Sequence, residues 1–161
     1  RRNKDEIVVA SMMKRKTVIS KLGIEMTVDT VIEEVNLDDF DFLFIPGGPG
    51  AFKILNTLPK VDEIIKHFAD NHKLVTAICA APMLIGRLGY LKDKNYTVHP
   101  GFEDQIIGGT YLRESGVVKD HNFITGKSMY YAIELALEVV RFFYGDKHTQ
   151  VLLDSLQGEI N

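Results

Sequence analysis

The apolar positions of this chain follow two alternating periods, which indicates strands and helices in turn. Residues 41–45 and 74–78 are nearly continuous apolar runs, as in parallel strands that are covered on both faces. Between them, apolar residues recur at the spacing of one helix face, which predicts an amphipathic helix over 61–70. A strand, a helix and a strand in this order are typical of an α/β fold.

The same pattern extends over the rest of the chain, with shorter elements. Turn residues separate the expected strands, and Pro59 and Gly145 are expected to end helices. Strands are expected at 7–10, 17–19, 22–28, 31–32 and 96–98, with two more within 116–125, and helices are expected at 51–58, 102–107, 133–144 and 149–156.

These elements predict a single α/β domain over residues 1–161 with a mostly parallel sheet. Ligands of such sheets bind beyond the carboxyl ends of the strands. The glycine-rich turn at Pro46–Gly50 and Cys79 both follow apolar strands, so the pattern places both at that end.

Cys79 stands where a buried strand is expected to turn sharply into a helix. Ala77 and Ala81 lie two residues before and after it, and such small residues allow a side chain to stand clear of the backbone, as in a G-x-S-x-G nucleophile elbow. Free N–H groups at the start of the following helix favour a thiolate. The competing interpretation is a buried structural thiol, because free cysteine is often buried. We favour a nucleophile.

Two further features could complete a site around this cysteine. His99 follows an apolar run, so it could approach the thiol as a base or orienting partner, although a lone histidine is more often a core or surface residue. Gly47 and Gly48 could present main-chain N–H groups to an oxyanion. A simple tight turn would explain the two glycines equally well.

Composition and charge exclude several classes of function. The chain has 161 residues, 45% of them hydrophobic and 25% charged, which is ordinary for a globular protein. A net charge of −3 argues against nucleic acid as a partner, and no apolar run is long enough for a membrane span. With one cysteine no internal disulfide can form, so we expect a reducing, cytoplasmic environment.

Two glycine patterns resemble nucleotide-binding motifs without matching them. Thr125–Ser128 ends like a P-loop, but His121 occupies the position of its first glycine. Gly48-Pro49-Gly50 begins like a dinucleotide-binding motif, but Lys53 occupies the position of the third glycine. We therefore expect no nucleotide cofactor, and no metal.

Taken together, the motifs resemble those of the ThiJ/PfpI superfamily, most closely the branch of the human Parkinson's disease protein deglycase. The resemblance rests on Phe44–Gly48, Gly50-Ala51, Ala77–Pro82 and Thr97–Pro100, in this order and at these intervals. It covers nearly the whole chain. It implies a flavodoxin-like three-layer sandwich, usually a homodimer, that uses no cofactor.

By position, the resemblance makes Cys79 the redox-sensitive nucleophile and His99 its neighbour, with the amides of Gly48 and Ala80 as anion-stabilising donors. It implies an enzyme that acts on small reactive carbonyls, by glyoxalase conversion of methylglyoxal to lactate or by removal of glycation adducts. The alternative is a redox sensor or chaperone without turnover, in which Cys79 oxidises to the sulfinate.

The chain departs from the superfamily pattern in three respects. The first strand and helix, with a glutamate that hydrogen-bonds the cysteine, would precede Arg1, so we expect them upstream or as a separate segment. Lys127–Tyr131 replaces an Arg-Gly-Pro-Gly-Thr-like turn, which changes the pocket. Ala80 stands where protease-like members have histidine, and no His-x-Glu pair of an amidotransferase follows Cys79, so both of those activities are disfavoured.

Overall fold

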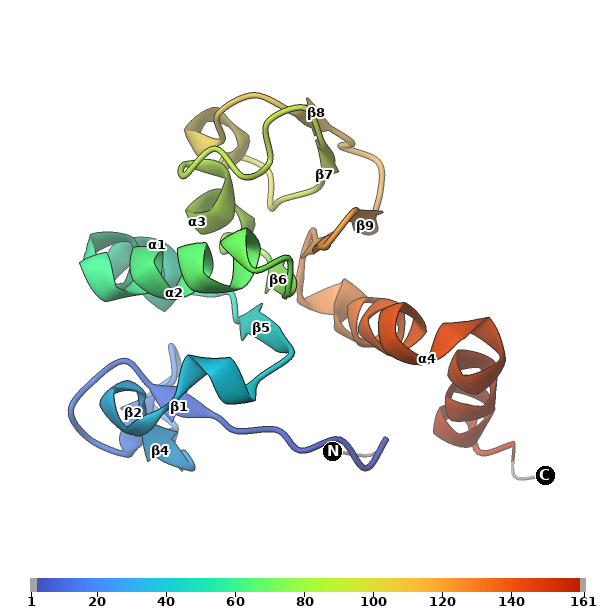
Figure 1. The fold of residues 1–161 in the computed structure, drawn as a ribbon, viewed down its shortest axis with the longest axis horizontal. Helices are drawn as coiled ribbons and strands as arrows, with labels where there is room; N and C mark the ends of the chain where they lie inside the picture. Colours follow the sequence, from blue (N-terminus) through green and yellow to red (C-terminus); the bar gives the residue numbers. More distant parts are fainter. Residues whose placement is uncertain (1–2, 160–161) are drawn as a thin grey trace. The chain divides into compact units, whose positions relative to one another are not determined.

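The computed structural model describes residues 3–159, which form two compact units (Figure 1). One unit ends at Phe40 and the other begins at Asp41. That residues 1–161 form a single domain stays a prediction.

The first unit consists of short paired strands and two turns of 3-10 helix. Val9 bonds to the turn at Asp29 through its N–H and its carbonyl, so the strand expected at 7–10 starts only at Ala10. Strand β1 (Ala10–Ser11) pairs in parallel with β4 (Thr30–Val31), and β2 (Thr17–Ile19) forms an antiparallel hairpin with β3 (Glu25–Thr27). The 3-10 turns are Ile32–Glu34 and Leu37–Asp39.

The second unit is built on a four-stranded sheet in the order β5-β6-β10-β9. Strand β6 (Leu74–Ile78) pairs in parallel with β5 (Phe42–Ile45) and with β10 (Phe123–Gly126). Strand β9 (Val117–Asp120) closes one edge as the antiparallel partner of β10. All residues of β6 are buried, as its continuous apolar run predicts.

The two faces of this sheet are covered by different helices. Leu74 and Ile78 pack with Leu135 of α4 (Ala132–Gln157). Because side chains alternate along a strand, Val75 points to the opposite face, where α2 (Pro59–Asp70) contacts β5 and β6. The amphipathic helix predicted before β6 is therefore confirmed.

Helix α4 is interrupted at Gly145, where the sequence predicts the end of one helix and the start of another. Gly145 has a φ of 79° and a ψ of 176°, which are not helical values. Thr149 Oγ1 donates to the Gly145 carbonyl over 2.9 Å, and Arg141 pairs with Asp146 across the break at 2.8 Å. The two halves are thus held together at the glycine by side chains.

Several minor elements are shorter than their sequence patterns predict. The strand expected over 96–98 stops at Tyr96. The Thr97 N–H donates to the side-chain hydroxyl of Thr125, at 2.9 Å, and not to a main-chain carbonyl of a neighbouring strand. The expected helices at 51–58 and 102–107 appear as single turns. The minor elements of the second unit are α1 (Pro49–Lys53), a 3-10 turn at Leu55–Thr57, α3 (Pro82–Gly86), β7 (Asn95–Tyr96) paired in parallel with β8 (Thr110–Tyr111), and 3-10 turns at Glu103–Gln105 and Met129–Tyr131.

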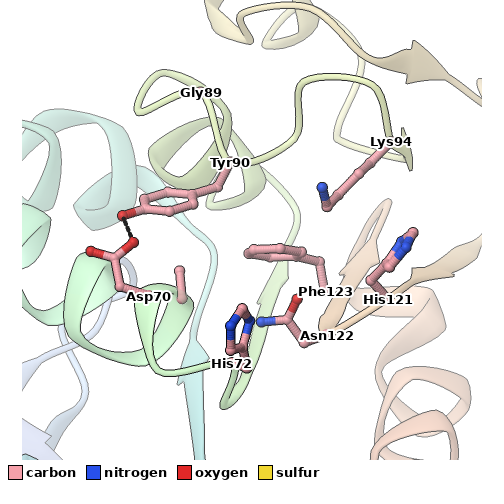
Figure 2. A pocket seen from close by; sticks show the side chains of 9 residues that line it. Asp70, His72, Gly89, Tyr90, Lys94, His121, Asn122 and Phe123 are labelled. Atoms are coloured by element: carbon pink, nitrogen blue, oxygen red, sulfur yellow. Dashed lines mark hydrogen bonds between the residues drawn. The ribbon is translucent and has the colours of Figure 1, made fainter.

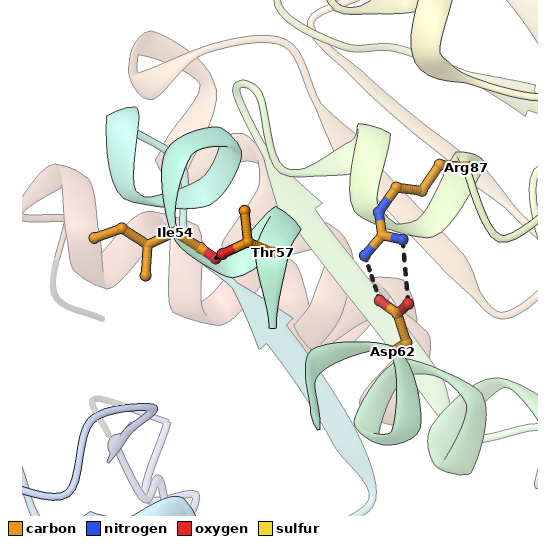
Figure 3. Close-up of polar contacts among 4 residues, drawn as sticks. All are labelled: Ile54, Thr57, Asp62 and Arg87. Atoms are coloured by element: carbon orange, nitrogen blue, oxygen red, sulfur yellow. Dashed lines mark hydrogen bonds and ion pairs between the residues drawn. The ribbon is translucent and has the colours of Figure 1, made fainter. Parts of the chain in front are cut away.

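Two polar contacts tie α2 to the segment that includes and follows α3. The Tyr90 hydroxyl donates to Asp70 Oδ1 over 2.7 Å (Figure 2). The guanidinium of Arg87 forms two hydrogen bonds to the Asp62 carboxylate (Figure 3). Since α3 directly follows the turn at Cys79, these contacts fix the position of the helix that follows the cysteine.

Hydrophobicity gives no sign of a membrane span in this structure. Across residues 3–159, no helix combines the length and the apolar character that crossing a bilayer requires.

Replacing Leu135 by alanine is expected to destabilise the second unit strongly. Leu135 is 3% exposed and packs on Leu74 and Ile78, so the variant leaves a cavity, and the free energy of unfolding should fall by about 2–4 kcal/mol in urea denaturation. Ile133 lies on the same helix but is 64% exposed, so Ile133→Ala is the matched control. Equal losses in the two variants would contradict this packing.

Tyr90, which follows α3, is expected to have a raised pKa. Burial, together with the hydrogen bond and the charge of Asp70, raises the pKa of Tyr90 from 10.0 to about 12. The contribution of the Tyr90 hydroxyl to stability is therefore present below pH 10 and is lost as the pH rises from 10.0 to about 12. The ultraviolet phenolate titration of the wild type minus that of Tyr90→Phe should have its midpoint at about 12. In an Asp70→Asn background, the midpoint should move down.

Candidate active site

Cys79 occupies a sharp left-handed turn between β6 and α3. Its φ is 64°, a value that residues other than glycine rarely adopt and that tends to occur at functional positions. The turn ends a strand whose residues are all buried, yet Cys79 itself is only partly buried. The backbone therefore turns sharply at Cys79, whose side chain stays partly buried against the core cluster that includes Ile78 and Leu135.

Main-chain hydrogen bonds hold this strained turn from two sides. The Cys79 N–H donates to the carbonyl of Gly126, at the end of β10, over 2.8 Å. The Cys79 carbonyl accepts from the N–H of His99 over 2.9 Å. Both main-chain groups of the cysteine are thus bound to segments far away in the sequence, which offsets the strain of the positive φ.

Gly47 lies directly against the cysteine. A Cβ atom at this position would be 2.5 Å from Cys79 Cβ and 2.9 Å from the Ile78 carbonyl, so no larger residue fits without a shift. The thiol sulfur would be 3.5 Å from the same point. The structure therefore brings the glycine-rich turn and the elbow together, as the sequence predicts for the carboxyl ends of neighbouring parallel strands.

Three main-chain N–H groups near this contact form no hydrogen bond with any described residue. They belong to Gly47, Gly48 and Ala80. Gly48 has a φ of 93° and begins the short helix α1, and Ala80 follows the cysteine directly. Free donors of this kind can stabilise an oxyanion, and that role of the three residues remains a prediction.

The helix after the cysteine is shorter than the sequence pattern predicts. Helix α3 spans only Pro82–Gly86, and turns follow it. The dipole of so short a helix is small, so an effect on the thiol depends mainly on the nearby N–H groups.

The structure brings the main chain of His99 to the elbow but does not join its ring to the thiol. The ring is exposed, and its Nδ1 lies 3.0 Å from the carbonyl of Pro100. None of the residues described here forms a hydrogen bond with Cys79 Sγ. The role of His99 as a base or orienting group stays a prediction.

The loop that carries His99 is supported by residues that the sequence pattern did not single out. The ring of Phe102 contacts His99 edge-on at a centroid distance of 6.2 Å and Phe52 at 5.1 Å. The Glu103 carboxylate accepts from the Gly101 N–H over 2.6 Å, and main-chain N–H groups, first its own, hold the pKa of Glu103 below its usual range. A carboxylate shortly after a Pro-Gly turn was the signal available in the sequence.

The segment that departs from the superfamily pattern starts at the same strand end. The Lys127 N–H donates to the Gly116 carbonyl over 2.8 Å, and the Tyr131 ring covers Gly116, where a Cβ would be 2.1 Å from the ring. Met129 and Tyr130 are 88% and 85% exposed. These bulky side chains therefore stand in solvent beyond β10.

Metal-binding side chains do not cluster in the part of the chain that the structure covers. Among residues 3–159, no three His, Cys, Asp or Glu side chains are placed to share an ion.

Curated proteins with similar sequences include proteins of archaea, animals, plants and a bacterium. An uncharacterized protein of Methanocaldococcus jannaschii is 38% identical over 76% of this chain, which spans 62% of that relative's length. A Pyrococcus abyssi protein named a deglycase is 36% identical over 76% of the chain and 73% of its own length. A Caenorhabditis elegans protein named a glutathione-independent glyoxalase is 32% identical, over 83% of this chain and 72% of its own length.

Solved structures share the fold over nearly the whole chain. The Drosophila melanogaster DJ-1beta structure has a TM-score of 0.89 with 27% identity, over 97% of this chain and 84% of that one. A Toxoplasma gondii DJ-1 structure, described as oxidized, has a TM-score of 0.85 with 26% identity, over 97% of this chain and 85% of that one. These likenesses bear out the flavodoxin-like α/β fold that the sequence predicts, and residues 1–142 match the DJ-1/PfpI family. The chain belongs to the DJ-1/PfpI family.

Proposed function

We propose that this protein is a cysteine-dependent enzyme that acts on small reactive carbonyl compounds without a cofactor. The observation that carries the proposal is Cys79, held at a φ of 64° on a turn that places its partly buried thiol beside Gly47. The relatives named a deglycase and a glyoxalase support this substrate class.

The reaction on methylglyoxal follows from the chemistry of a thiolate. Cys79 Sγ attacks the aldehyde carbon and forms a hemithioacetal, whose oxyanion the N–H groups of Gly47, Gly48 and Ala80 stabilise. A proton then moves from the former aldehyde carbon to the neighbouring carbon, which converts the adduct into a thioester of lactate. Water hydrolyses the thioester, and lactate and the free thiol are released.

Proton transfer in this scheme is assigned to His99. Its N–H donates to the carbonyl of the cysteine, so its imidazole stands on a loop that is bonded to the nucleophile's own residue. The Pro100 carbonyl at 3.0 Å favours a proton on Nδ1, which leaves Nε2 as the basic nitrogen. The Phe102 ring limits the orientations of the imidazole.

A second candidate function is a redox sensor or chaperone in which Cys79 is oxidised and no substrate is turned over. Cys79 is the single cysteine of residues 1–161 and is partly exposed, so within this sequence no second thiol can convert a sulfenic acid into an internal disulfide. Oxidation to a sulfinate is then the expected course. The related Toxoplasma gondii structure was described as oxidized.

Replacing the nucleophile separates the two functions. The Cys79→Ser variant should lose at least about a hundredfold in the rate of methylglyoxal consumption, because a hydroxyl is a far weaker nucleophile than a thiolate. The assay follows methylglyoxal loss together with lactate formation, resolved by a chiral method. His72→Gln, which changes an exposed histidine at the other end of β6, is the control.

Equal rates of methylglyoxal consumption for the wild type and Cys79→Ser would reject the proposal of a cysteine-dependent enzyme. If the wild type shows no turnover but gains the mass of two oxygens at Cys79 in peroxide, the sensor is supported instead. Tracing that mass to a methionine, with Cys79 unmodified, would reject the sensor.

The close packing at the elbow predicts opposite effects for two neighbouring glycines. Gly47→Ala inserts a methyl group 2.5 Å from Cys79 Cβ, so it should destabilise the protein by about 1–3 kcal/mol and slow turnover by about ten- to a hundredfold. Gly50 lies in α1 with open space around it, so Gly50→Ala should be neutral or stabilise by up to about 1 kcal/mol. Thermal unfolding and the methylglyoxal assay measure both effects, and indistinguishable variants would contradict the packing at Gly47.

A further inference from the structure

A hollow lies at the opposite end of the four-stranded sheet from Cys79. It has a volume of about 490 Å³, and its walls include residues just before β6 and at the start of β10 (Figure 2). Strand β6 has five residues, so this hollow and the thiol are separated by roughly 15 Å or more at about 3.3 Å per residue. The proposed carbonyl chemistry therefore leaves it unused.

Two aromatic rings form the apolar part of the hollow. The ring centroids of Tyr90 and Phe123 are 6.2 Å apart, and their planes are inclined by 30°. Gly89, at a φ of 84°, contributes only backbone to the wall. The rings thus offer a surface suited to an aliphatic chain or to a cation.

Opposite charges stand on the two sides of these rings. Asp70 lies at the hydroxyl of Tyr90, and Lys94 lies over the ring of Phe123 (Figure 2). The Tyr90 hydroxyl orients the Asp70 carboxylate with one hydrogen bond of 2.7 Å, and further lone pairs of the carboxylate can accept. Lys94 Nζ lies 5.8 Å from the Phe123 centroid and pairs with no carboxylate within residues 3–159.

The other titratable groups at the hollow do not cancel this separation of charge. His72 and His121 are exposed on its rim, at φ values of 55° and 52°. Asp120, next to His121, is already bonded to the Asn95 N–H at 2.8 Å and to the His121 ring, and the Asn95 N–H is the main cause that holds the pKa of Asp120 below its usual range.

We propose that this hollow binds a small elongated zwitterion, with an ammonium group at one end and a carboxylate at the other, joined by an apolar chain. The ammonium pairs with Asp70, the carboxylate pairs with Lys94, and the chain crosses the rings of Tyr90 and Phe123. Lysine-like ω-amino acids belong to this class. A simple anion meets the repulsion of Asp70 and a simple cation meets that of Lys94, so the site selects ligands that carry both charges.

Ligand-induced shifts of main-chain amide resonances test the proposal. ε-Aminocaproate, added to the wild-type protein, should shift the amides of Tyr90, Lys94 and Asn122 in a saturable way. Caproate and hexylamine each keep the chain but only one charge, and each should bind at least about tenfold more weakly, because one charge-assisted hydrogen bond is lost.

Two variants remove the proposed partners one at a time. Lys94→Met and Asp70→Asn should each weaken ε-aminocaproate binding by at least about tenfold, and Asp70→Asn keeps an oxygen for the Tyr90 hydroxyl. Lys92→Met is the matched control, since Lys92 is exposed in the same loop but lies outside the hollow, and its affinity should equal that of the wild type.

Three results would overturn the proposal. They are the absence of saturable shifts, equal affinity for caproate and ε-aminocaproate, and shifts confined to residues away from the hollow. A change of unfolding temperature in Lys94→Met is measured in parallel, so that lost binding is not confused with lost folding.

Discussion

The pairing of β6 with two parallel neighbours is the constraint on which the second unit depends. Its main chain is bound by β5 on one side and by β10 on the other, and its side chains are buried on both faces. A strand enclosed in this way can neither slide nor rotate. The residue that follows it, Cys79, therefore emerges at a fixed point, and the position of the thiol is set by the sheet rather than by a loop.

Small residues are required wherever other segments approach this strand end. Gly47 touches the cysteine, and a Cβ at Gly126 would be 2.7 Å from Leu135 Cδ1 of the covering helix. Ala77 and Ala81 are fully buried on either side of the turn. The site is thus formed by close approach of backbones: even a methyl group at either glycine would force neighbouring atoms to shift, and the two alanines leave no room for a larger side chain.

The larger elements could be predicted because each carries a strong periodic signal. Strands β5 and β6, helix α2 and the break of α4 at Gly145 all lie where apolar runs, helical spacing and a glycine indicate them. Strand β7 is shorter than its apolar run, since hydrogen bonds of Thr97 to Thr125 and Ser115 replace a regular ladder there. Bonds between segments so distant along the chain leave no local pattern in the sequence.

The same reasoning explains how much of the candidate site could be predicted. A cysteine between small residues after an apolar strand indicates the turn, and the structure has a positive φ at that residue. The support of the His99 loop by Phe52 and Phe102 has no signal in the sequence, because each ring contributes only through its partner, whereas Glu103 is indicated only by its place after a Pro-Gly turn. The orientation of the His99 ring depends on the Pro100 carbonyl, a main-chain group that every sequence has.

The way in which Cys79 is anchored also affects what can change at this position over evolution. Its N–H and its carbonyl are both bound to other segments, whereas its side chain bonds to no described residue. Folding therefore depends on the backbone of residue 79 and on the size of its side chain, which packs against Gly47 and the core, more than on the chemistry of that side chain. Such a position can exchange one reactive group for another while the surrounding fold is inherited unchanged, which gives a lineage a route to new chemistry at little cost in stability.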